Sequence, residues 1–142
     1  MTALLSSRGE RMEKWAHHEL TLKATKKAYQ NGFAVGEKSS GKVIPAASAT
    51  GLVMLGLFDE SIDASSTGPL GAVDQPVTVH FDPEITVYWR PGDGTISASN
   101  LFSPCYFSDD QTVSLNSANQ PLAGTIVGFN ATTGEVAFTK DL

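Results

Sequence analysis

Hydrophobic residues follow a helical period at the start of the chain and a strand period from about residue 20 onward. A Ser-x-x-Glu capping box begins at Ser7, and the apolar residues after it are spaced to lie on one face of a helix. The sequence therefore predicts a short helix near residues 8–18. The apolar face of this segment consists of Met12, Trp15, Ala16 and Leu20.

Beyond this segment, short apolar stretches alternate with turn residues. Leu20, Leu22 and Ala24 alternate with polar residues, and clusters of Gly, Pro, Asn and Asp separate the later stretches. The predicted strands span residues 20–24, 33–35, 42–44, 52–58, 77–81, 85–89, 105–107, 112–115, 122–129 and 136–139, with an exposed loop at 61–71.

So many short strands indicate a mainly β protein, a compact β-barrel or sandwich with a short N-terminal helix or arm. A parallel α/β fold is not expected, because no long helical pattern separates the strands. We divide the chain into an N-terminal helical arm at residues 1–19 and a β-rich domain at residues 20–142.

Charge is distributed unevenly along the 142 residues. Residues 1–43 hold eight of the ten Lys and Arg and carry a net charge of +4, whereas the remainder carries −9. Because four acids interrupt the basic segment, nucleic acid is not an expected partner. Neither a membrane-spanning stretch nor a secretory signal is evident, so synthesis in the cytoplasm is expected and a membrane partner is not.

The reactive residues of the sequence indicate no enzyme, no cofactor and no metal site. His17 and His18 are adjacent and would point apart, while His80 stands alone in a predicted strand. The pair Asp109–Asp110 fits a solvated turn without a bound ion, and the single cysteine, Cys105, fits a buried small hydrophobic residue.

Aromatic residues leave two functions open. Tyr88 and Trp89 are consecutive in a predicted strand, so one should face the core and the other a surface. An exposed aromatic suits a subunit interface, and it also suits a carbohydrate-binding face.

The order of several turn and core motifs resembles the head decoration (cement) proteins of tailed bacteriophages. The resemblance covers roughly residues 20–142 and leaves residues 1–19 without a counterpart. It implies a β-barrel-like homotrimer on the outer capsid surface of the virion, clamping neighbouring major capsid protein subunits. The stretches that carry it are GFAV at 32–35, SGKVIPA at 40–46, GLVMLG at 51–56, CYFSDDQTV at 105–113 and LAGTIVG at 122–128.

The expected function is therefore a structural capsid decoration protein. The alternative is a β-module attached to the virion tail or surface that recognises carbohydrate through exposed aromatics. The N-terminal arm is expected to anchor the protein to an adjacent subunit through Met12, Trp15, Ala16 and Leu20, since an isolated helix of this length is marginal in water. A second possibility is that it folds back as a plug on its own body.

Overall fold

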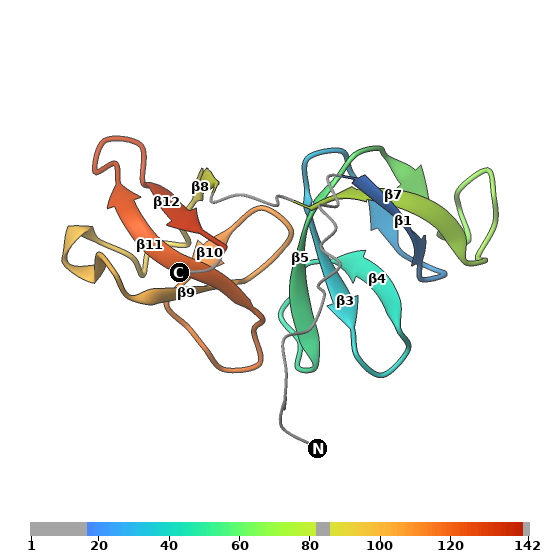
Figure 1. The fold of residues 1–142 in the computed structure, drawn as a ribbon, viewed down its shortest axis with the longest axis horizontal. Coiled ribbons are helices and arrows are strands. Elements are labelled where there is room, and N and C mark those ends of the chain that lie inside the picture. Colours follow the sequence, from blue (N-terminus) through green and yellow to red (C-terminus); the bar gives the residue numbers. More distant parts are fainter. Residues whose placement is uncertain (1–16, 82–85, 141–142) are drawn as a thin grey trace, which may run out of the picture.

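The computed structural model describes residues 17–81 and 86–140 of the chain. These residues form two β-rich bodies that lie side by side, with β1 to β7 in one and β8 to β12 in the other (Figure 1). The mainly β architecture predicted from the strand spacing is confirmed.

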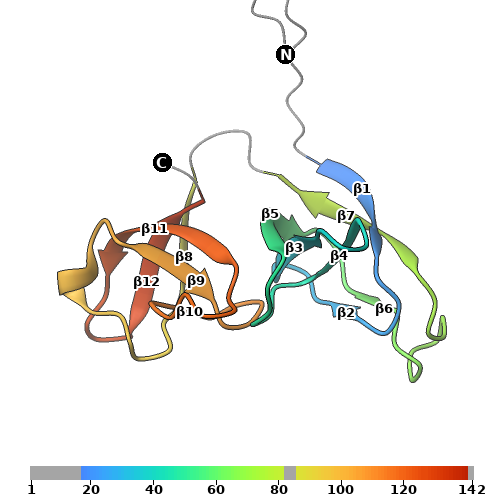
Figure 2. The same ribbon diagram turned by 90° about the horizontal axis from the view of Figure 1, so that it is seen from below.

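The first body is a closed barrel of five strands in the order β1-β4-β3-β5-β7. β1 and β7 pair antiparallel over six residue pairs, whereas β1 meets β4 in parallel at the single pair Leu22–Val43. The barrel strands are β1 (His17–Leu22), β3 (Phe33–Glu37), β4 (Lys42–Pro45), β5 (Leu52–Phe58) and β7 (Gln75–His80), and the short pair β2 (Lys27–Ala28) and β6 (Ile62–Asp63) lies beside them (Figure 2).

The second body is an antiparallel sheet of five strands in the order β10-β9-β11-β12-β8. β8 is therefore its last strand on one side among the described residues. The elements are β8 (Val87–Pro91), the short 3-10 helix η1 (Ala98–Asn100), β9 (Pro104–Phe107), β10 (Val113–Ser114), β11 (Leu122–Phe129) and β12 (Glu135–Thr139).

Strand β3 joins two hydrophobic cores because both of its faces are buried. Phe33 and Val35 pack into the core between barrel and sheet, while Ala34, between them in sequence, packs inside the barrel. Alternate side chains of a strand point to opposite faces, so one apolar run serves both cores. β5 is used in the same way, with Met54 toward the sheet and Leu55 toward the barrel interior.

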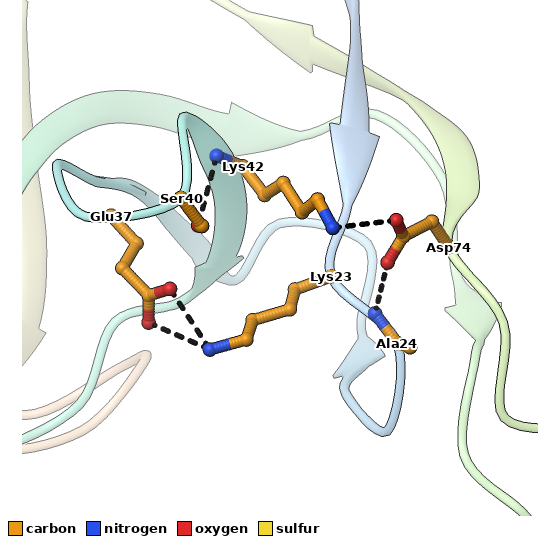
Figure 3. Close-up of polar contacts among 6 residues, drawn as sticks. All are labelled: Lys23, Ala24, Glu37, Ser40, Lys42 and Asp74. Carbon is orange, nitrogen blue, oxygen red and sulfur yellow. Dashed lines mark hydrogen bonds and ion pairs between the residues drawn. The ribbon is translucent and has the colours of Figure 1, made fainter.

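Two ion pairs bridge segments around the loose β1–β4 contact (Figure 3). Lys23 Nζ donates to both carboxylate oxygens of Glu37, at 2.9 and 3.2 Å. Lys42 Nζ lies 2.7 Å from Asp74 Oδ2, and the other oxygen of Asp74 accepts a hydrogen bond from the Ala24 backbone N–H. These contacts hold the end of β1, the β3–β4 hairpin and the segment before β7 together.

The structure corrects the sequence-based boundaries at several points. β1 begins at His17, so the predicted helix is wrong at residues 17–18, and residues 17–19 belong to the β-rich body. The rest of that helix lies outside the described residues. β6 lies inside the predicted 61–71 loop, and the strand expected at residues 20–24 ends at Leu22. In the described part of the chain, no helix is long and apolar enough to cross a membrane.

Candidate interaction surfaces

The outer face of β8 carries one exposed aromatic side chain, that of Trp89. Tyr88 points into the core, where its ring centre lies 5.2 Å from that of Phe33, and Trp89 points the other way and is 48% exposed. A Cβ added to Gly128 would lie 3.4 Å from Cη2 of Trp89, so the small residues Gly128 and Ala137 form the floor beneath the indole. The expectation of one core and one surface aromatic is confirmed.

Phe102 is the most exposed large hydrophobic side chain among the described residues, at 77%. Its backbone has φ +69°, in the left-handed region that an aromatic residue rarely adopts. The Phe102 N–H donates to the Ile126 carbonyl at 2.7 Å, and the Ile126 N–H donates to the Ser103 carbonyl at 2.9 Å. Hydrogen bonds to β11 thus hold this aromatic out in solvent despite the strain.

A polar cleft of about 660 Å³ lies at the junction of the two bodies. Exposed Tyr29 lines one part, and Arg90 enters from β8, donating to the backbone carbonyls of Trp89 and Asn31. The Arg90 guanidinium carbon lies 4.9 Å from the centre of the Phe33 ring, a cation–π distance, and burial lowers the pKa of Arg90.

Asp109 and Asp110 have different roles in the turn between β9 and β10. Asp109 Oδ1 accepts the backbone N–H groups of Gln111 and Thr112, as the turn prediction requires. Asp110 instead lines the cleft beside Gly32. Burial raises the pKa of the Asp110 carboxyl, and the charge of Asp109 adds to the shift. Asp110 is therefore less solvated than the sequence suggested.

An apolar pocket of about 320 Å³ opens between the barrel strands, and we call it the barrel mouth. It lies where β1 and β4 diverge from their single pair. Leu20 and Leu55, which also pack against the barrel core, form its inner wall together with Val43. His18, Val53 and Phe81 lie around them.

His17 and His80 come together across the β1–β7 pair, which sequence spacing did not indicate. Their rings stack with centroids 4.6 Å apart and an interplanar angle of 9°, and His17 Nδ1 contacts the Asp59 carboxylate. Across residues 17–81 and 86–140, no group of three or more His, Cys, Asp or Glu side chains is placed to hold a metal ion.

Cys105 is fully buried in the core between barrel and sheet, as its apolar context predicted. Burial raises the pKa of its thiol to about 12, so the thiolate is scarce at neutral pH.

Of the four residues predicted for the arm, the structure describes only Leu20. Leu20 lies in β1 and lines the barrel mouth, so it belongs to the body and not to an arm. Met12, Trp15 and Ala16 lie outside the described residues. Phe102 is one of the aromatic residues that the sequence offers for a binding face, but its exposure and its positive φ are visible only in the structure.

Comparisons with protein-family models, with curated proteins and with solved structures found no match to this chain.

Proposed function

We propose that the protein is a structural capsid decoration protein. It binds the outer surface of a tailed-phage head as a homotrimer and stabilises contacts between major capsid protein subunits. The sequence resemblance supports the choice of partner, and the exposed apolar side chains support a mechanism based on buried surface.

The exposed side chain of Phe102 is the main support for the proposal. An aromatic ring left in water loses the favourable free energy of burial, and the positive φ of this residue adds backbone strain. Both costs suggest that the ring makes its contact with a binding partner. Trp89 adds a second aromatic on a regular strand. Trp89 lies on a strand, and the backbone of Phe102 is hydrogen-bonded to β11. Apolar anchors held in this way bind without losing much conformational freedom, which is the property a clamp requires.

Trimer formation would multiply these contacts. Each copy offers the same anchors, so a symmetric trimer touches several capsid subunits at once, and modest single contacts become strong together. Native mass spectrometry of the free and capsid-released protein tests this point. A trimer in either sample is expected, whereas monomer alone in both contradicts it.

Binding to capsids that were assembled without this protein tests the function directly. Phe102→Ala and Trp89→Ala should each weaken binding, while Leu70→Ala, at another exposed apolar position, should bind as the unchanged protein does. Negative-stain images should place the protein on the head surface. No binding to heads, or binding confined to tails, would reject the proposal.

The junction cleft favours a second function, carbohydrate recognition by a virion-attached β-module. Its exposed Tyr29 offers a stacking surface, and Asp110 and Gln111 offer hydrogen-bonding groups to hydroxyls. Screening the protein against immobilised glycans tests this function. Binding that Tyr29→Ala abolishes, together with no binding to heads, would favour it over capsid decoration.

A further inference from the structure

The junction cleft is lined by three segments that lie far apart in the sequence. Residues 29–32 come from the turn between β2 and β3, Arg90 comes from β8, and Asp110 and Gln111 come from the turn between β9 and β10. The volume of about 660 Å³ corresponds to roughly 20 water molecules at liquid density, which leaves room for several side chains of a partner. Ligand sites are frequent at such junctions between structural units.

The guanidinium of Arg90 has no carboxylate partner among the described residues. It packs over the buried ring of Phe33, and two of its N–H groups donate to the backbone carbonyls of Trp89 and Asn31. A guanidinium has five N–H donors, and it matches a carboxylate in charge and in planar shape. Because Arg90 is partly buried, a carboxylate that reached the remaining donors would be favoured.

Asp110 places a negative charge in the same cleft but does not pair with Arg90. In the part of the chain that the structure describes, no cationic side chain lies within ion-pair distance of this carboxylate. It lies beside Gly32, where an added Cβ would approach Oδ2 to 3.1 Å. Asp110 is also partly buried, so a cation in the cleft would stabilise its charged form. The cleft therefore holds a cation and an anion that do not neutralise each other.

We propose that the junction cleft binds a segment of a partner protein that carries one acidic and one basic side chain. The acidic side chain places its carboxylate on the guanidinium of Arg90, and the basic side chain lies at Asp110. This arrangement gives specificity, because a segment with the wrong charge brings like charges together. The carboxamides of Gln30 and Gln111 offer hydrogen bonds to the backbone of the segment. The inference does not depend on the proposed capsid function.

A random library of short peptides displayed on yeast tests the site, with the full-length protein as the labelled target. Peptides are sorted for binding to the unchanged protein and then for loss of binding to Arg90→Gln. We expect the surviving peptides to share an acidic and a basic residue. Synthetic copies of them should bind Arg90→Gln at least about tenfold more weakly, because the charge-assisted hydrogen bonds are lost.

Lys38→Gln is the matched control, because it removes the same charge from an exposed position outside the cleft. It should bind the peptides as the unchanged protein does. Asp110→Asn tests the second contact. Replacing the basic residue of a peptide with Ala should weaken binding to the unchanged protein, but it should have little effect on binding to Asp110→Asn. If Arg90→Gln does not fold, as judged by circular dichroism, Asp110→Asn takes its place in the second sort.

Three results would overturn the proposal. The first is a library in which no peptide needs Arg90 or Asp110 for binding, and the second is a set of surviving peptides without an acidic residue. The third is binding of neutral glycans that Tyr29→Ala abolishes and Arg90→Gln leaves unchanged, which would assign the cleft to carbohydrate.

Discussion

Arg90 places its guanidinium carbon 4.9 Å from the centre of the Phe33 ring, across the junction between sheet and barrel. The same ring lies 4.7 Å from Phe107 and 5.7 Å from Phe138, centre to centre. Phe33 thus connects the first strand of the β3–β4 hairpin to three strands of the second sheet, because Tyr88 also contacts it.

Replacing Phe33 with Ala should destabilise both bodies together. The side chain is fully buried among aromatic rings, so its loss leaves a cavity and should cost about 3–5 kcal/mol of unfolding free energy. Denaturant unfolding measures this loss. Phe102→Ala is the control, since Phe102 is exposed and its truncation should cost less than about 1 kcal/mol. Equal losses in the two variants would contradict the role of Phe33.

Gly124→Ala should prevent stable folding. A Cβ at Gly124 would lie 1.7 Å from the Thr139 carbonyl oxygen on the neighbouring strand, and backbone on both sides would have to move. We expect a loss of more than about 3 kcal/mol in denaturant unfolding. Gly36→Ala is the matched control, because its Cβ makes an ordinary contact. If Gly124→Ala and Gly36→Ala had the same unfolding free energy, β11 and β12 would have to separate easily.

Acid should weaken the barrel through Asp74. The hydrogen bond and charge of Lys42 lower the pKa of Asp74 below its ordinary value of 3.8, and the Ala24 N–H adds to the shift. A lowered folded-state pKa gives stability that is present above about pH 4 and is lost as the pH falls through the folded-state value.

Asp74→Asn tests this dependence, because Asn keeps an oxygen for the Ala24 N–H but does not titrate. Melting temperatures between about pH 6 and pH 2 should fall less steeply for Asp74→Asn than for the unchanged protein. Leu70→Ala, at an exposed position without a titratable group, is the control and should keep the original slope. Identical slopes for all three proteins would show that Asp74 does not cause the loss of stability in acid.

Phe102 separates stability from binding. Gly adopts positive φ without strain, whereas Ala does not, so Phe102→Gly should be more stable than Phe102→Ala by about 1 kcal/mol. Both variants lack the ring and should bind undecorated capsids equally weakly. Thermal melts together with capsid co-sedimentation measure the two effects. Full binding by either variant would show that the ring is not an anchor.

The local pattern of the sequence predicted most of the strands. Leu52–Phe58 and Leu122–Phe129 form strands over the predicted residues. A run of apolar residues bounded by turn residues can be recognised from neighbouring positions in the sequence alone. The same pattern placed Cys105 in the core, and it predicted that Tyr88 and Trp89 face opposite sides. Alternation of side chains along one strand is sufficient for such statements.

The pattern failed where neighbouring strands decide the outcome. Residues 17–18 continue a helical period in the sequence, but they lie in β1, where pairing with β7 sets the backbone. The pair β2–β6 is too short to show a period. Tertiary pairing overrides weak local preference at such positions.

The sequence by itself determined which segments become strands and which of their residues are apolar enough for a core. Only the tertiary structure decided which segments meet. It stacked His17 on His80, placed Asp110 and Arg90 around one cleft, and opened the barrel mouth beside the N-terminal segment. The reason is that strand register and barrel closure depend on contacts between residues far apart in the chain, and no local period encodes those contacts.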